Sequence, residues 1–584
     1  MKHFLSFLLP LFVGINAYSQ IDFNNYQTLQ SKGDVPADFS DLTSKKIEEG
    51  MTERRTEIGS AMEQREFLEQ TGYAIDELLH SGLVVYGDEL SSYVSSIGDK
   101  LLKGNPDLRS KLRFYTLKLN ATNAFSTDQG IIFVTTGLIS QLSSEAQLAY
   151  ILAHEISHYT EKHVVETFTW KKNNRYGRDW VDRMSVYSKD KEFSADELAV
   201  DMYRKAGYAK EEILTTFDVL LYSYLPFDEV PIDLDYFATD QLFLPEFLFP
   251  TKEYEITADP DEDDSNSSHP NVSKRKEAVQ KEIDGVKKSW GTTVNSEGDA
   301  RFYELRNIAR FESVRTDVAQ AAFGNALYSI YLLEREFPES IFLQRMKMHS
   351  WLGLYQYESL SRVNKTILSN RDLEGQSAPV HYFIRKLNRK SLTTVALRHI
   401  YDIHEQYPED LEIGAMYTYS LKLLAKDEKF DIDEYSVMTF TEYADSVELK
   451  RIQAENDTLS LKPVEEPKKK SKYDRIKSNE SPDVIDESID SLKYYYYGLA
   501  DLVRDSSFLQ ELESYTPVES NLPPEEDYNG RRGRKYYQNK AYEELKIGSD
   551  DVIVVEPRAI DYSRKGVDLV KSEKLEGMFA DAIV

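Results

Sequence analysis

Three residues in the pattern H-E-x-x-H have the types and spacing for hydrolytic chemistry: His154, Glu155 and His158. On a helix, residues four apart lie on one face, so both imidazoles would point toward a single ion. Zinc suits such a site, because neutral imidazole binds it well and its coordination geometry is undemanding. Glu155 would then accept a proton from a metal-bound water. The pattern predicts one Zn²⁺ per chain and hydrolysis by an activated water.

A catalytic zinc needs a third protein ligand, with the fourth position left for water. The extension H-E-x-x-H-x-x-G-x-x-H does not supply it, because Glu161 and Val164 stand where its glycine and last histidine belong. Glu192 and Asp196 are four apart on another predicted helix. Such a pair alone often marks a solvated helix face. Together with the H-E-x-x-H pattern earlier in the chain, it favours a metal site. We predict that Glu192 binds the metal and that Asp196 accepts an N–H from a ligand histidine.

A further histidine, His163, follows His158 by five residues. On a continuous helix it is rotated by about 140° from His158, which excludes it from the same ion. We expect it either at the surface or in contact with a ligand.

The elements that position these residues follow from the spacing of apolar residues. Strands are predicted at 112–119 and 131–135. A helix that begins near Ser143 carries the H-E-x-x-H pattern, and a second helix over 191–205 carries the two acidic residues. The fold class is therefore α+β and mainly helical.

Charge and cysteine content narrow the possible partners. The chain has 100 acidic and 71 basic residues, and its net charge of −29 repels phosphate backbones and anionic lipid surfaces. Nucleic acid is not an expected partner. The absence of cysteine excludes disulfides, a thiol nucleophile and a lipid attached to cysteine.

The first residues resemble a secretory signal. Lys2 precedes a short apolar stretch at 4–13, and a small-x-small cleavage site ends at Ser19. We expect a signal peptide at 1–19, with an uncleaved anchor as the alternative. Without another segment apolar enough to cross a bilayer, the mature protein is expected to be soluble, in a periplasm or outside the cell.

The rest of the chain divides by composition. Residues 20–295 are expected to form the metal-binding domain. Residues 300–455 are predicted to be helical repeats, because matches recur at an offset of 70, about twice the tetratricopeptide period; an unrelated helical bundle is the alternative. Residues 456–490 are a predicted disordered linker. Residues 491–584, with a strand at 552–555, are expected to form a small α/β module of unknown role.

Several segments together resemble one family. They are Asn123-Ala124-Phe125, residues 132–138, the pattern from His154 to His158, Glu192 to Asp196, residues 206–208, and His269-Pro270 with Arg275. In this order they are similar to the gluzincin metallopeptidases that include the CAAX prenyl endopeptidase, HtpX and the soluble periplasmic beta-barrel assembly-enhancing protease. The similarity covers residues 85–285.

The resemblance implies a zincin-like fold with His154, His158 and Glu192 as ligands and Glu155 as general base. It implies that Asn123, Ala124 and Phe125 lie on an edge strand that binds extended substrate, although Phe125 itself also fits a packing role. His269 or Arg275 would stabilise the oxyanion; alternatively His269 only caps the helix that Pro270 begins.

The chain also departs from the family. It lacks the transmembrane helices of the prenyl endopeptidase and HtpX. Its long apolar stretch at 217–268 is a predicted lid, and its last module has no counterpart in the resemblance.

These observations predict a zinc-dependent endopeptidase that hydrolyses internal peptide bonds of exported proteins, as envelope protein quality control. Its partners would be unfolded or misassembled polypeptides and an envelope protein docked on the helical repeats. Two other classes stay open: a chaperone or assembly factor with a latent metal site, and a scaffold in which the repeats matter most.

Overall fold

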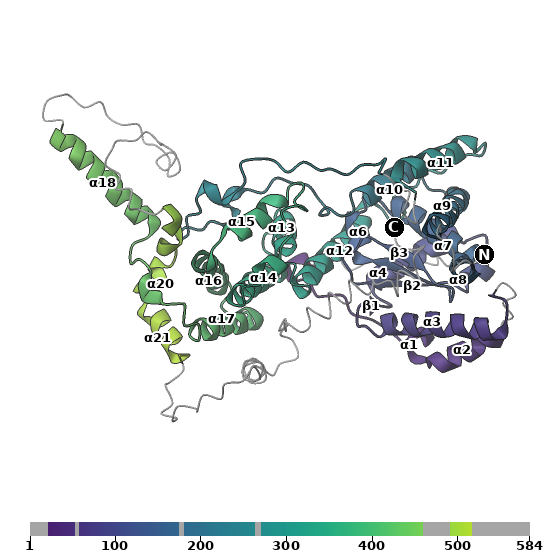
Figure 1. The fold of residues 1–584 in the computed structure, drawn as a ribbon, viewed down its shortest axis with the longest axis horizontal. Coiled ribbons are helices and arrows are strands. Elements are labelled where there is room, and N and C mark those ends of the chain that lie inside the picture. Colours follow the sequence, from purple (N-terminus) through teal and green to yellow (C-terminus); the bar gives the residue numbers. More distant parts are fainter. Residues whose placement is uncertain (1–20, 53–57, 174–179, 263–269, 459–490, 517–584) are drawn as a thin grey trace, which may run out of the picture.

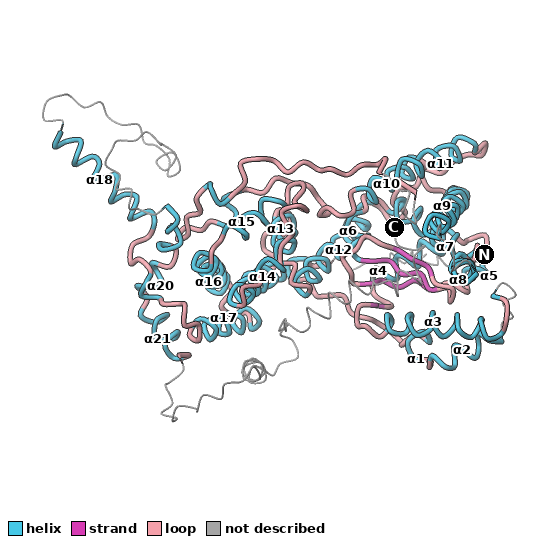
Figure 2. The backbone as a smooth tube through the Cα atoms, in the orientation of Figure 1, coloured by secondary structure: helices cyan, strands magenta, loops and turns pink. Residues whose placement is uncertain are grey.

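The computed structural model describes residues 21–52, 58–173, 180–262, 270–458 and 491–516. Figure 1 shows two lobes joined by one long helix, α12 (Asp299–Ala319). One lobe holds the strands and α1–α11, and we call it the sheet lobe. The other, the helical lobe, contains α13–α17 and the described C-terminal helices; Figure 2 shows it free of strands. The chain is thus a mainly helical α+β protein, as its sequence predicts.

The sheet has four strands in the order β1-β2-β4-β3. Parallel pairing joins β2 (Arg113–Leu117) to β4 (Ile131–Thr135). Antiparallel pairing adds β1 (Val84–Val85) to β2 and β3 (Ala124–Ser126) to β4. The two predicted strands are confirmed. Their β-branched and aromatic residues suit a buried sheet. Among the described residues, β3 forms one edge.

Helices cover both faces of this sheet. On one face, α3 (Ala61–Leu79) contributes Ile75 and Leu79 to a cluster with Phe125 and Phe133. On the other face, α4 (Glu89–Leu101) and α7 (Glu145–Thr160) pack on Ile132 and neighbouring side chains. The remaining short helices of this lobe are η1 (Phe23–Asn25), α1 (Ala37–Ser40), α2 (Thr43–Thr52), α5 (Pro106–Arg109), α6 (Thr136–Gln141) and α8 (His163–Asn173).

Helix α7 is the centre of the sheet lobe. Every residue from Glu145 to His158 is buried. Ser144 is its N-cap and accepts a hydrogen bond from the Gln147 amide, one residue later than the predicted start at Ser143. Helices α4, α9 (Trp180–Lys205) and α10 (Glu211–Leu221) pack against it, and α11 (Val272–Gly285) packs on α9 and α10.

The buried carboxylate of Glu145 fixes the first turn of α7. It accepts hydrogen bonds from the hydroxyls of Tyr93 (2.5 Å), Tyr208 (2.6 Å) and Ser296 (2.7 Å), and Lys100 Nζ lies 3.2 Å away. Burial raises the pKa of Glu145, but the three hydroxyl donors and Lys100 outweigh it and the pKa is lowered. The helix is therefore held by one charged group that contacts three other segments: α4, the residues around Tyr208 and the residues around Ser296.

The helical lobe is built from antiparallel neighbours. Helices α13 and α14 pack together, as do α16 and α17, and α14 packs on α16. Residues matched at the 70-residue offset fall on corresponding helices: Ala326 on α13 and Ala396 on α16, Leu354 on α14 and Leu424 on α17. Tetratricopeptide-like repeats stay a prediction. The bounds are α13 (Phe323–Glu334), α14 (Ile341–Ser359), η5 (Val363–Lys365), α15 (Ala378–Lys386), α16 (Arg389–Gln406), α17 (Leu411–Leu424), η6 (Ile432–Glu434) and α18 (Phe440–Thr458).

The stretch at 217–268, predicted to be a lid, does something else over most of its described length. After α10 it leaves the sheet lobe and crosses the helical lobe as an extended chain with η3 (Leu234–Phe237) and η4 (Glu246–Leu248). Phe237 stacks on Phe383 with 5.0 Å between ring centroids and meets Trp351 edge-on. The lid prediction is wrong for this segment, because its apolar side chains are buried in the helical core rather than over the metal site.

The described part of the C-terminal region is helical and joins the same core. It comprises η7 (Ser491–Tyr497), α20 (Ala500–Arg504) and α21 (Ser506–Ser514). Leu499 and Phe508 are buried beside α16 and α17, and Arg398 of α16 pairs with Asp501 at 2.8 Å. Residues 491–516 are therefore part of the helical lobe, whereas the sequence places them in a separate α/β module.

Several predictions concern residues outside the described ranges: the signal at 1–19, most of the linker at 456–490 and the strand at 552–555. In the part of the chain that the structure describes, no helix combines the length and apolar character needed to span a bilayer.

Replacing Glu145 by Gln tests the anchor of α7. The NH₂ group of the glutamine side chain would face hydroxyl groups that donate to the carboxylate in the wild type, and the negative charge would be lost. We therefore expect the free energy of unfolding to fall by about 2–3 kcal/mol at neutral pH, measured by chemical denaturation. Because the folded-state pKa is lowered, the difference from wild type should be full above the ordinary carboxyl pKa and fade as pH falls through the folded value. Exposed Glu211→Gln is the control; equal loss in both variants would contradict the anchor.

Candidate metal centre

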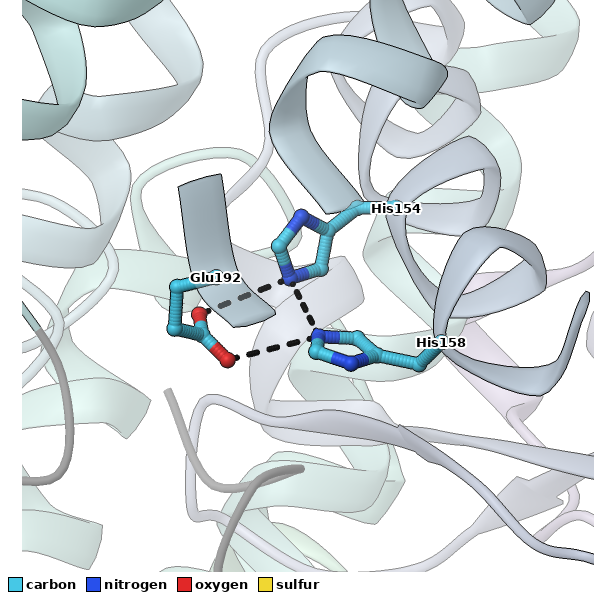
Figure 3. A group of neighbouring side chains, drawn as sticks. All are labelled: His154, His158 and Glu192. Atoms are coloured by element: carbon cyan, nitrogen blue, oxygen red, sulfur yellow. Dashed lines mark hydrogen bonds and ion pairs between the residues drawn. The ribbon is translucent and has the colours of Figure 1, made fainter. Parts of the chain in front are cut away.

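His154, His158 and Glu192 converge from two helices (Figure 3). The two histidines lie one turn apart on α7, with their Nε2 atoms 2.9 Å apart. Glu192, on α9, places Oε1 3.3 Å from His158 Nε2 and Oε2 3.6 Å from His154 Nε2. All three ligand atoms lie within 4.8 Å of one another, and all three side chains are buried. The structure thus brings together the three residues that the sequence selects as ligands.

Asp196 holds the outer nitrogen of His154. Its Oδ1 lies 2.9 Å from His154 Nδ1 and accepts a hydrogen bond from the Tyr150 hydroxyl at 3.2 Å. Arg275 donates two hydrogen bonds of 2.9 Å to the same carboxylate. Burial alone would raise the pKa of Asp196, but the charges of Arg275 and His154 lower it to about 2. An ionised Asp196 favours a proton on Nδ1, which leaves Nε2 of His154 as the nitrogen that faces the ligand cluster.

His163 holds the other ligand histidine. Its Nδ1 lies 2.7 Å from Nδ1 of His158, and its side chain is buried. The rotation of about 140° between the two side chains assumed one continuous helix. The helix is not continuous, because α7 ends at Thr160 and Lys162 has a positive φ of 57°. This break returns His163 to His158 at the start of α8. Of the two expected places for His163, contact with a ligand is the one observed.

Glu155 stands beside the ligands with no partner of its own. It is fully buried, and within the described residues neither carboxylate oxygen accepts a well-formed hydrogen bond. Burial raises the pKa of Glu155 to about 8, helped by Glu192 and opposed by His154, Arg275 and the Ser126 backbone amide. An uncompensated buried carboxylate is costly. Its position next to two imidazoles and a second carboxylate fits a cation and a water bound among them.

The donor set fits zinc. Two imidazoles and one carboxylate are a common set for a catalytic Zn²⁺, which leaves a position open for water. Asp196 and His163 supply the outer hydrogen bonds that orient such ligands. Among the described residues, this is also the one cluster of histidine and acidic side chains close enough to hold an ion.

The edge strand β3 lies along the site. In an antiparallel pair, alternate residues turn their backbone groups toward the neighbour. Asn123 and Thr127 bond to β4, so the amides and carbonyls of Ala124 and Ser126 face the open edge. Phe125 packs on the far face of the sheet, 5.0 Å from the ring of Phe133. The structure therefore supports the packing role for the Phe125 side chain.

A small pocket adjoins this edge. It is bordered by Ala124 of β3 and the preceding Asn123, by His154 and Glu155 of α7, and by Arg275 of α11. The buried Oδ1 of Asn123 has no hydrogen-bond partner in the part of the chain that the structure describes. His269, the other predicted catalytic residue, lies outside the described residues.

Comparison with known proteins agrees with this geometry. Residues 91–175 match the sequence profile of peptidase family M48. This segment of the chain is similar to that family. The resemblance drawn from its motifs is confirmed, and the structure contains the candidate His-His-Glu metal site that a metallopeptidase of this family requires. Glu192 lies beyond the matched residues, so its place among the ligands rests on the structure.

The similarity to individual M48 proteins is distant and local. The chain is 26% identical over 109 residues to the beta-barrel assembly-enhancing protease of Yersinia pestis, 19% of this chain and 22% of that protein. It is 27% identical over 109 residues to the protein of that name from Escherichia coli (strain K12), with the same shares. It is 30% identical over 115 residues to the mitochondrial metalloendopeptidase OMA1 of Arabidopsis thaliana, 17% of this chain and 23% of that protein. The chain thus spans less than a quarter of the curated relatives it matches.

A His163→Phe substitution tests the contact with His158. Loss of the hydrogen bond to a ligand should weaken zinc affinity by about 10- to 100-fold, measured by competition with a chelator. His80→Phe, an exposed histidine of the same lobe, serves as the control. Equal zinc affinity in His163→Phe and wild type would exclude this orienting role.

Proposed function

We propose that this chain is a zinc-dependent endopeptidase that hydrolyses internal peptide bonds of unfolded or misassembled exported proteins. The observation that carries the proposal is the buried set of His154, His158 and Glu192 beside the carboxylate of Glu155, which accepts no well-formed hydrogen bond from the described residues. A zinc ion bound there would polarise the substrate carbonyl and lower the pKa of its water. Glu155 then accepts the proton of the attacking water and delivers it to the leaving amine.

The open edge of β3 gives the substrate its orientation. An extended polypeptide that pairs with the backbone of Ala124 and Ser126 lies beside Glu155, and this pairing needs little sequence from the substrate. Asn123 offers an additional buried acceptor for a substrate N–H. Unfolded chains satisfy this requirement best, because their backbone groups are free to pair.

Arg275 is better suited to positioning than to oxyanion binding. Two of its donors are held by Asp196, and Nη1 lies 3.5 Å from Oε2 of Glu192. Its charge thus stabilises the carboxylates that hold His154 and the metal. His269 remains the proposed oxyanion donor. The capping alternative is wrong, because Asn271 is the N-cap of α11 and its side chain accepts a hydrogen bond from the Lys274 amide.

The proposed substrates and location draw on two further observations. The relatives named beta-barrel assembly-enhancing proteases support an envelope role, and residues 1–19 have the character of a secretory signal. We propose a periplasmic enzyme whose tetratricopeptide-like helical lobe docks substrate or an envelope partner.

Burial of the site favours a second candidate function. His154, Glu155 and Glu192 are 4%, 0% and 1% exposed, so a polypeptide reaches them only after the cleft opens. A chaperone or assembly factor with a latent metal site is consistent with such burial.

Metal analysis and one substitution separate these functions. We expect about one zinc per purified chain by mass spectrometry, lost in His158→Ala and Glu192→Ala. Glu155→Gln should keep the zinc and slow cleavage of an unfolded protein by about 10²- to 10⁴-fold. A cellular function that survives Glu155→Gln would favour the chaperone, and a wild type that never binds zinc would refute both metal-dependent functions.

A His269→Phe variant tests the proposed oxyanion donor. Zinc content should be unchanged, whereas turnover of an unfolded protein should fall roughly a hundredfold, because one hydrogen bond to the developing negative charge is lost. Asn271→Ala, which removes the observed N-cap of α11, controls for a capping effect. Turnover equal to wild type would remove His269 from the mechanism.

A further inference from the structure

We propose that Asn120 and Gly137 are positioning residues: together they fix the edge strand β3 beside Glu155 and thereby determine how tightly an extended polypeptide binds. Neither residue belongs to the candidate ligand set or borders the pocket beside Glu155. The inference rests on the proposed pairing of substrate with β3, and it identifies the contacts that hold that strand in place.

The strand β3 has little support of its own. It is three residues long, and among the described residues it pairs with one neighbour, β4. So few ladder hydrogen bonds leave its position dependent on the residues that lead into it. Ala124 borders the same pocket as Glu155, so a shift of the strand moves the groups that would pair with substrate relative to the general base.

The side-chain amide of Asn120 ties the loop before β3 to α12. It donates to the backbone carbonyl of Ser313 at 2.9 Å and to Asp317 Oδ1 at 2.7 Å. Burial raises the pKa of Asp317 to about 7, and the hydrogen bond from Asn120 opposes that rise. The buried acid and the loop therefore stabilise each other, at a point three residues before Asn123, where bonding to β4 begins.

Gly137 supports the same loop from α6. Its amide donates to the backbone carbonyl of Leu119 at 2.9 Å. A Cβ at Gly137 would clash with the backbone carbonyl of Asn120 and lie 2.7 Å from the carbonyl oxygen of Ala121. Gly137 has no positive φ, so close approach rather than backbone conformation requires glycine here. The loop thus rests on α6 with no room for a methyl group.

The Thr135 hydroxyl connects this loop to the strand. It donates to the backbone carbonyl of Ala121 at 2.6 Å and accepts a hydrogen bond from the Asn123 amide at 3.1 Å. Residues 120–123 and β3 are therefore one hydrogen-bonded unit, and a displacement at Asn120 or Gly137 reaches Ala124.

Two hydroxamates test this assignment. Acetohydroxamate binds zinc without pairing with a strand, whereas the hydroxamate of a short polyalanine peptide can do both. Both are titrated into the zinc-loaded full-length protein by calorimetry. Asn120→Ala and Gly137→Ala should each weaken the peptide hydroxamate by about tenfold or more and change the affinity for acetohydroxamate by less than about twofold.

Asn105→Ala, which removes an exposed N-cap of α5, is the control and should change neither affinity. Peptide binding as tight as in the wild type, or tighter, in either Asn120→Ala or Gly137→Ala would overturn the proposal.

A double variant separates positioning from loss of stability. Asn120→Ala leaves Asp317 buried without its donor, which by itself destabilises the fold. In Asn120→Ala/Asp317→Ala that acid is gone, so the free energy of unfolding should recover relative to the single variant while peptide affinity stays low. Recovery of peptide affinity together with stability would show that Asn120 has only a structural role and would refute the assignment.

The wild type separates this inference from the proposed function. If it binds zinc and acetohydroxamate but gains nothing from the peptide, the pairing of substrate with β3 is refuted at its source, before any variant is compared. If it prefers the peptide but hydrolyses no protein, the peptidase function fails, and a loss of that preference in Asn120→Ala and Gly137→Ala still supports their positioning role.

Discussion

The structure depends on burying a polar metal site within a helix that is covered on every side. Helix α7 is buried from Glu145 to His158, and its ligands lie in its last turns. Charged and polar groups in such a position are costly unless each has a partner. The surrounding elements supply them: Asp196 for His154, His163 for His158, and Arg275 for Asp196. Within the described residues Glu155 accepts no well-formed hydrogen bond, and that is the group whose proposed role is to accept a proton.

The need to pair these buried polar groups determines how the helices pack. Glu192 and Asp196 lie one turn apart on α9, so one helix supplies both a candidate metal ligand and the carboxylate that contacts another candidate ligand. Arg275 joins α11 to the pair, and Lys191 Nζ donates to the backbone carbonyl of His163 at 3.0 Å, which joins α8. A shift of α9 against α7 would therefore break both the ligand set and its outer hydrogen bonds. Metal binding and packing of these helices are linked for that reason.

The sequence predicts those features that depend on local spacing. The ligands on α7 and the acidic pair on α9 follow from residues four apart, and the two longer strands follow from β-branched and aromatic composition. The sequence left open whether His163 lies at the surface or contacts a ligand, because the contact with His158 depends on a left-handed turn at Lys162, a residue type that seldom adopts one. The composition of the apolar stretch after α10 predicts that it is buried, but it does not indicate which part of the protein it packs against. Its partners, such as Phe383 and Trp351, lie more than a hundred residues further along the chain.

The two lobes are not independent units. The predicted boundary at residues 295–300 falls just before α12, whose apolar side chains belong to the core of the sheet lobe while its end leads into α13. Tyr26 donates a hydrogen bond of 2.8 Å to the buried Glu312 of α12, so the N-terminal segment packs on the same helix. The loop that leads into β3 is also bound there, since Asn120 donates to the backbone of Ser313 at 2.9 Å and to Asp317 at 2.7 Å. The position of the edge strand, and with it the cleft beside Glu155, thus depends on α12 as much as on the sheet. The helix that leads into the helical lobe therefore also supports the candidate metal centre.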